Sequence, residues 1–231
     1  MTMKQIPLSI TLPKSSTFSG YFGERNNHTV EAVQQYTTGS GPGPIYLYGP
    51  TGCGKTHLLH AACTVLASQR QQPFYLSFSD CGSLSPKVLR ALEELDLIAL
   101  DDLQCIAGDD NWELALFTLF NSVVERGGRL LITANTSIDQ LGICLPDLRS
   151  RIGWCTIFRL EELEDPEKIG ALQAQARRRG MELNDEVGRY LLSRVRRDMG
   201  SLLEVLDQLD DASLVAQRRL TIPFVRGILN P

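Results

Sequence analysis

The sequence predicts an α/β fold in which a five-stranded parallel sheet, covered by helices on both faces, precedes a small all-helical domain. A glycine-rich phosphate-loop pattern stands between an apolar strand and a helix over residues 45–62. Five short apolar strands alternate with helical segments up to about residue 162, and only helical patterns follow. Strands that alternate with helices are typical of a parallel sheet that is buried on both sides.

The phosphate-loop pattern G-x-x-x-x-G-K-[ST] is matched by Gly49-Pro50-Thr51-Gly52-Cys53-Gly54-Lys55-Thr56. The backbone N–H groups of such a loop form an anion site at the start of the next helix, and its glycines permit the curvature. We expect Lys55 to reach the β- and γ-phosphates and the Thr56 hydroxyl to hold Mg²⁺. A glycine-rich turn without a ligand is the alternative, and the flanking strand and helix disfavour it.

Polar residues end two later strands. Residues 73–78 predict a second strand, and the strand over 97–100 ends in Asp101 and Asp102. We expect Asp101 to assist Mg²⁺ through water and Asp102 to polarise the attacking water, the alternative being a solvated acidic turn. The strand over 129–133 leads to Asn135, which is placed to touch a γ-phosphate or that water, the alternative being a strand-end cap.

Two helices are expected between these strands, over residues 87–95 and 112–125. The second carries an apolar face at helical spacing, which we expect to be core: Leu114, Phe117, Phe120, Val123 and Val124. A short segment over 147–152, with Arg149 and Arg151 at its end, precedes a final strand over 155–158.

The C-terminal part predicts four helices, over residues 165–179, 184–196, 198–217 and 222–229, which form a small lid. The expected boundaries are an extended tail over 1–16, a nucleotide-binding base over 17–162 and the lid over 163–231. Near the start of the base, Tyr21 and Phe22 are equally compatible with flanking a nucleotide base and with the core.

Composition narrows the class of protein. The 231 residues carry a net charge of −4, and basic residues cluster only locally, at 177–179 and 194–197, so we expect any DNA contact to be indirect. None of the six cysteines forms a C-x-x-C pair, which disfavours a zinc site. Prolines interrupt any signal peptide and no apolar run approaches membrane length, so we expect a cytoplasmic protein without a membrane partner.

The first residues alternate apolar and polar side chains. Ile6, Leu8, Ile10 and Leu12 recur at every second position, and the intervening prolines exclude a helix. Such a strand can dock into a groove or onto a sheet edge of another protein. An edge strand of the base and a disordered end are the alternatives.

Several motifs resemble the DnaA family of AAA+ replication initiators over roughly residues 17–229. The P-loop with its flanks, residues 48–61, is similar to that of DnaA, as is the Asp101-Asp102-Leu103-Gln104 segment. Residues 131–135 resemble the sensor 1 strand, 150–154 resemble the S-R-F-G-W-G arginine-finger box, and 197–203 resemble the sensor 2 segment. The resemblance implies an AAA+ fold, ADP or ATP with Mg²⁺ at the P-loop and His57, and roles for Asn135 (sensor 1), Arg197 (sensor 2) and Arg151 (arginine finger).

Within that family the sequence resembles the Hda group of DnaA-homologous regulators. It is expected to lack the additional N-terminal and DNA-binding domains of DnaA, and residues 5–10 are similar to the clamp-binding motif Q-L-S-L-P-L. The implied clamp contacts are Gln5, Ile6, Leu8 and Ile10. The group's implied activity is to bind the DNA-loaded sliding clamp, the β subunit of DNA polymerase III, and to promote hydrolysis of DnaA-bound ATP through Arg151 in trans. Re-initiation of chromosome replication is thereby prevented, in the bacterial cytoplasm and at the nucleoid through the clamp.

An autonomous AAA+ ATPase, such as a helicase loader or remodelling factor, is the second hypothesis. In that protein Asp101, Asp102 and Asn135 would serve its own turnover, which the first hypothesis expects to be weak. A small-molecule P-loop kinase is disfavoured by the four-helix lid and by Arg197. The resting nucleotide, assembly into a homodimer or a higher oligomer, and a contribution of Arg149 at the interface are left open.

Overall fold

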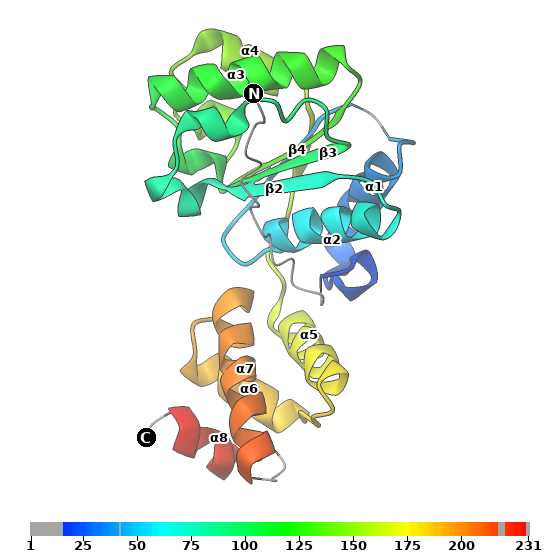
Figure 1. Cartoon of the computed structure of the whole chain (residues 1–231). Coiled ribbons are helices and arrows are strands. Elements are labelled where there is room, and N and C mark those ends of the chain that lie inside the picture. The colour runs from blue at the N-terminus through cyan, green and yellow to red at the C-terminus, as the bar shows by residue number, and fades with distance from the viewer. Residues whose placement is uncertain (1–15, 42, 217–219, 230–231) are drawn as a thin grey trace. The chain divides into compact units, whose positions relative to one another are not determined.

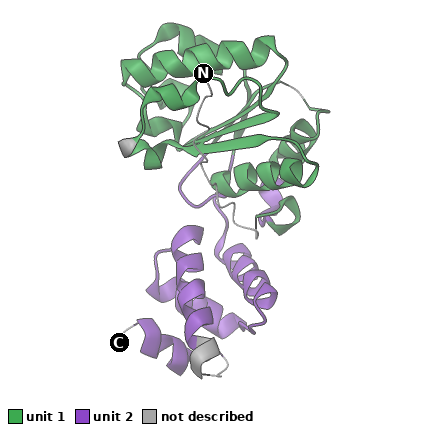
Figure 2. Ribbon diagram, in the orientation of Figure 1, with its two compact units in different colours: residues 1–20, 28–48, 55–159 green, residues 21–27, 49–54, 160–231 purple. Residues whose placement is uncertain are grey.

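The computed structural model describes residues 16–41, 43–216 and 220–229. The predicted clamp contacts Gln5, Ile6, Leu8 and Ile10 lie outside the described residues. The chain divides into two compact units, coloured separately in Figure 2. The base unit comprises residues up to 20, 28–48 and 55–159, and the helical unit comprises 21–27, 49–54 and the residues from 160 onward.

The base unit is built on five parallel strands in the order β2-β3-β4-β1-β5. The strands are β1 (Ile45–Tyr48), β2 (Pro73–Ser77), β3 (Leu97–Asp101), β4 (Arg129–Ala134) and β5 (Thr156–Arg159). Every residue of β3 is buried, as a strand with neighbours on both sides and helices on both faces should be. The predicted α/β fold with a five-stranded parallel sheet is confirmed.

Helices cover both faces of this sheet. They are α1 (Asn27–Thr37), α2 (Lys55–Ser68), α3 (Asp110–Glu125) and α4 (Pro146–Ile152). Figure 1 shows α1 and α2 on one face of the sheet and α3 and α4 on the other. The core between the sheet and the second pair contains Ile98, Phe120 and Leu148, all almost fully buried. This packing holds the carboxyl ends of β1, β3 and β4 at one edge, where ligand sites of such sheets lie.

The predicted helix over residues 87–95 is wrong. A single 3-10 turn, Pro86–Leu89, is present, after which Arg90 is extended and Ala91 adopts a left-handed φ of 59°. Leu89 is the one fully buried side chain of that turn. Val88, Leu92 and Leu95 have helical spacing and pack against the core of the base unit. The left-handed Ala91 interrupts any helix between them, and the chain turns instead into β3.

The predicted helix over 112–125 is confirmed as α3, but its predicted core face is wrong at two positions. Leu114 is 58% exposed and Val124 is 39% exposed, whereas Leu116 and Leu119 are buried. The helix is apolar over more than half of its circumference, so spacing alone could not identify the side that faces the sheet.

The helical unit contains α5 (Asp165–Arg178), α6 (Asp185–Arg194), α7 (Met199–Ala216) and α8 (Ile222–Leu229). The four predicted helices are therefore confirmed, with small shifts at their ends. Leu172, Leu191, Leu206 and Val225 are fully buried in a core shared by these helices. None of the helices in the described ranges combines the length and the apolar character needed to cross a membrane.

Candidate functional site

The glycines of the P-loop take conformations that other residues avoid. Gly52 and Gly54 have φ values of 83° and 99°. A Cβ on Gly52 would lie 3.0 Å from the Cβ of Asp198 and 3.1 Å from the backbone nitrogen of Met199, within the helical unit. The loop therefore packs directly against the residues that follow Arg197, the predicted sensor 2 residue.

Tyr21 braces this loop from within the same unit. Its hydroxyl donates a 2.7 Å hydrogen bond to the carbonyl oxygen of Cys53, and its ring lies against Gly54. The side-chain amide of Asn26 donates to the Tyr21 hydroxyl at 2.9 Å. Burial raises the pKa of Tyr21, so the hydroxyl keeps its proton and remains a donor. Phe22, its neighbour in the prediction, is half-buried.

Lys55 and Thr56 form the first turn of α2, directly after the loop. Lys55 is 7% exposed, and the Thr56 hydroxyl donates a 2.6 Å hydrogen bond to Oδ2 of Asp101 at the end of β3. The next residue, His57, places its Nε2 2.8 Å from the carbonyl oxygen of Thr17. The structure thus brings the two predicted metal-site residues, Thr56 and Asp101, into contact.

Asp101 is 1% exposed, and its carboxylate accepts hydrogen bonds from two further hydroxyl groups. The Tyr75 hydroxyl, from β2, donates to Oδ2 at 3.0 Å, and the Thr133 hydroxyl, from β4, donates to Oδ1. Burial, reinforced by the charge of Asp101, raises the pKa of Tyr75, so its hydroxyl keeps the proton that it donates to Asp101. Sequence reasoning missed both residues; their one signal is a hydroxyl side chain on each of the strands that flank β3.

Asp102 and Asn135 are joined through a residue that had no predicted role. Asp102 has left-handed backbone angles, with φ 59° and ψ 47°, and its Oδ1 accepts from Nε2 of Gln104 at 2.8 Å. Oε1 of Gln104 in turn accepts from the backbone nitrogen of Asn135 at 3.0 Å. Gln104 therefore couples the second aspartate to the residue after β4.

The two arginines of α4 differ in their surroundings. Nη2 of Arg149 forms a 2.8 Å ion pair with Oδ1 of Asp139. The guanidinium carbon of Arg151 lies 4.1 Å from the ring centroid of Trp154, and Arg151 has no ion-pair partner in the part of the chain that the structure describes. Buried Glu113 on α3 positions this helix, because its carboxylate accepts from the backbone nitrogens of Cys144 and Leu145 just before α4.

Arg197 lies in the helical unit, before α7. It is exposed, and its Nη1 is 3.6 Å from Oδ2 of Asp165. Its neighbour Asp198 accepts from the backbone nitrogen and the hydroxyl of Ser201, both at 2.9 Å. These bonds fix the start of α7 beside Gly52.

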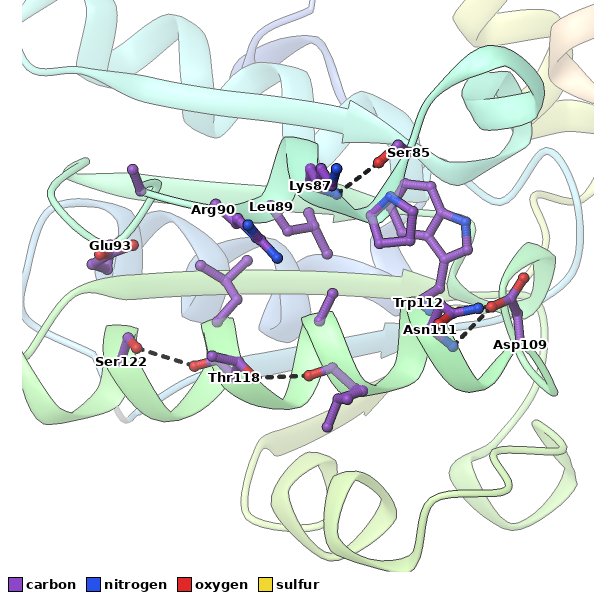
Figure 3. Close-up of a pocket in the computed structure, with 15 residues that line it drawn as sticks. Ser85, Lys87, Leu89, Arg90, Glu93, Asp109, Asn111, Trp112, Thr118 and Ser122 are labelled. Atoms are coloured by element: carbon purple, nitrogen blue, oxygen red, sulfur yellow. Dashed lines mark hydrogen bonds between the residues drawn. The ribbon is translucent and has the colours of Figure 1, made fainter. Parts of the chain in front are cut away.

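A groove of about 690 Å³ between the Pro86–Leu89 turn and α3 lies apart from these residues (Figure 3). Its walls include Lys87, Arg90, Trp112 and Leu114, and none of the predicted site residues lines it. The groove is therefore separate from the candidate nucleotide site.

Two family models match the chain. The bacterial DnaA ATPase domain matches residues 12–80 and 83–159, and the Hda lid domain matches residues 165–229. Together the two models match most of the chain.

Solved structures of AAA+ proteins have the same fold. Domain III of the replication initiation protein DnaA from Thermotoga maritima is 20% identical, with a TM-score of 0.79, covering 95% of this chain and 99% of that one. AMPPCP-bound DnaA from Aquifex aeolicus is 24% identical, with a TM-score of 0.70 and coverages of 85% and 66%. The Holliday junction branch migration motor RuvB from Thermotoga maritima is 18% identical, with a TM-score of 0.68 and coverages of 93% and 71%. Because the DnaA ATPase model spans more than half of the chain and the Hda lid model follows it, this protein belongs to the DnaA family of AAA+ proteins and has a lid of the Hda type.

Proposed function

We propose that this protein is a regulator of the Hda type, which promotes hydrolysis of ATP bound to DnaA by supplying Arg151 in trans. One observation carries the proposal. Arg149 is engaged by Asp139, whereas Arg151 faces the ring of Trp154 and keeps its N–H donors outside any ion pair in the described residues. The match to the Hda lid model supports the assignment to a regulator.

An arginine finger acts on the charge of the transferring phosphoryl group. Its planar guanidinium donates to phosphate oxygens as negative charge develops there. Supplied in trans, such a residue raises the hydrolysis rate by about 10³–10⁵, which corresponds to roughly 4–7 kcal/mol of transition-state stabilisation.

The protein's own P-loop is proposed to bind ADP or ATP with Mg²⁺. The Thr56 hydroxyl and the Asp101 carboxylate, 2.6 Å apart, are the hard oxygen ligands that Mg²⁺ prefers, so these residues fit the ion. Thr56 would hold it directly and Asp101 through water, and the ion would neutralise phosphate charge. Lys55 would contact the phosphates, as would Arg197, whose neighbours Asp198 and Met199 lie against Gly52.

The partners follow from the same proposal. Gln5, Ile6, Leu8 and Ile10 would bind the sliding clamp, so that the protein reaches DNA indirectly. DnaA would be the second partner, engaged by the surface that carries Arg151. One of the solved DnaA structures with this fold was obtained with AMPPCP and single-stranded DNA, which supports nucleotide binding in this family.

The test is single-turnover hydrolysis of ATP pre-bound to DnaA, in the presence of clamp-loaded DNA. We expect the wild-type protein to accelerate hydrolysis and Arg151→Ala to abolish the acceleration while folding and nucleotide affinity are unchanged. Arg149→Ala is the matched control on the same helix, and we expect it to retain most of the acceleration. Stimulation by Arg151→Ala at the wild-type rate would contradict the proposal.

An autonomous ATPase is the second candidate. It is favoured by two hydrogen-bonded groups, Thr56 with Asp101 and Gln104 with Asp102 and Asn135, which together have the parts needed for hydrolysis in cis. Steady-state turnover by the purified protein without DnaA separates the two functions. Rapid turnover that Arg151→Ala leaves intact would support this second candidate.

A further inference from the structure

Trp154 is the most exposed of the large apolar side chains in the described residues, at 63%. It lies two residues after α4, and its backbone nitrogen donates a 3.0 Å hydrogen bond to the carbonyl oxygen of Arg151. The indole ring covers the guanidinium of Arg151, whose carbon is 4.1 Å from the ring centroid. Burial does not explain a tryptophan at this position, whereas its ring packs on Arg151.

The chemistry of this contact matters for what Arg151 can do. A cation–π contact uses the face of the guanidinium, whereas the N–H donors lie at its edge and in its plane. The ion pair of Arg149 with Asp139 occupies edge donors. The ring of Trp154 therefore restrains Arg151 without occupying the donors that would bind phosphate oxygens.

We propose that Trp154 is a positioning residue for Arg151, holding its guanidinium against the indole face with the phosphate-binding edge available. This inference rests on the proposed function, because it assigns Trp154 to the same hydrolysis reaction. A free arginine side chain samples many rotamers, and a stacked one loses fewer of them on reaching its target. Removing the ring should therefore slow the step that uses Arg151 rather than weaken docking.

The stack is first tested without DnaA. Trp112 is 8% exposed and Trp154 is 63% exposed, so acrylamide quenching reports mainly on Trp154 in the wild-type protein. We expect Arg151→Ala to raise the quenching constant, because it uncovers one face of the indole, and Arg149→Ala to leave it unchanged. Equal quenching of wild type and Arg151→Ala would overturn the stacked arrangement whatever the protein's function is.

The role is then tested in single-turnover hydrolysis by DnaA over a range of regulator concentrations. If the contact has the free energy of a typical exposed cation–π interaction, Trp154→Leu should lower the maximal rate about two- to fivefold. The half-saturating concentration should be unchanged. Trp154→Phe, which keeps an aromatic face, should restore most of the rate. Leu114→Ala removes another exposed apolar side chain, on α3, and should have no effect.

Two outcomes would overturn the positioning role. One is a wild-type maximal rate for Trp154→Leu, and the other is a change confined to the half-saturating concentration, which would make Trp154 a docking contact. Failure of the proposed function is distinguishable, because in that case Arg151→Ala would stimulate hydrolysis as well as the wild type does, whatever the quenching result.

Discussion

The hydroxyl of Thr56 donates a 2.6 Å hydrogen bond to the carboxylate of Asp101, joining the first turn of α2 to the end of β3. This bond brings together the two residues proposed to hold Mg²⁺, the hydroxyl directly and the carboxylate through water. With Tyr75 and Thr133 it gives the buried carboxylate three hydroxyl donors. A carboxylate in the low-dielectric interior requires such hydrogen-bond donors, because burying it without them costs free energy.

Thr56→Ala should weaken nucleotide binding only when Mg²⁺ is present. The substitution removes the proposed direct ligand and leaves the loop backbone unchanged, so we expect about a tenfold loss of affinity, or about 1.4 kcal/mol. Isothermal titration with ADP in Mg²⁺ and in excess EDTA measures the difference. An equal loss in both conditions would show that Thr56 contributes to the fold of the loop rather than to the metal.

Tyr75→Phe should destabilise the base unit. The variant keeps the ring but deprives Asp101, 1% exposed, of one donor, which typically costs about 1–3 kcal/mol. Urea denaturation at neutral pH measures the free energy of unfolding. Tyr48→Phe is the matched control, because the Tyr48 hydroxyl has no hydrogen-bond partner among the residues that the structure describes, and its stability should stay near wild type.

Gly52→Ala should weaken nucleotide binding more than the cost of a left-handed alanine explains. Gly52 has a φ of 83° and faces Asp198, whereas Gly108 has a φ of 86° and open space where a Cβ would lie. Both alanines carry the cost of a left-handed conformation, about 1–2 kcal/mol. We expect only Gly52→Ala to lose ADP affinity, measured by titration. A matching loss for Gly108→Ala would mean that general destabilisation is responsible.

Asp198→Ala should destabilise the protein in a pH-dependent manner. Burial by itself raises the pKa of Asp198, but hydrogen bonds from Ser201 and the charge of Arg196 outweigh it, and the pKa lies below its ordinary value. A carboxyl with a lowered folded-state pKa contributes stability above its unfolded pKa, near 4, and loses that contribution as the pH falls through the folded-state value. We therefore expect a deficit of about 1 kcal/mol at pH 7 that shrinks below about pH 4, measured by urea denaturation. A deficit that stays constant down to pH 3 would contradict the electrostatic account.

Gln5→Ala combined with Leu8→Ala should remove binding to the sliding clamp without changing the melting temperature. Both residues belong to the proposed six-residue motif, which contributes through side chains that enter a groove on the partner. Surface plasmon resonance on immobilised clamp measures binding, with Leu12→Ala, outside the motif, as the control. Clamp binding by the double variant at wild-type affinity would rule out the motif.

Short stretches of sequence were sufficient to predict the elements that are defined by residues close together in the chain. The P-loop follows from the spacing of its glycines, Lys55 and Thr56, and the end of β3 follows from an apolar run that stops at Asp101. The four C-terminal helices follow from periodicity and caps, as at α6, where the Asn184 side chain accepts from the backbone nitrogen of Val187. These features need no knowledge of which strands are neighbours.

Tertiary structure decided the contacts between residues far apart in the chain. Tyr75 and Thr133 reach Asp101 because β2 and β4 flank β3 in the sheet. The apolar pattern of each strand does not reveal this strand order. Packing also left residues 87–95 without a longer helix, although Val88, Leu92 and Leu95 contact the core, and it selected the buried side of α3. The sequence by itself therefore determined the family, the strands and the phosphate loop, which are local patterns of residue type. The hydroxyl donors that Tyr75 and Thr133 give to Asp101 came only from the fold, because hydrogen bonds depend on distances that only packing sets.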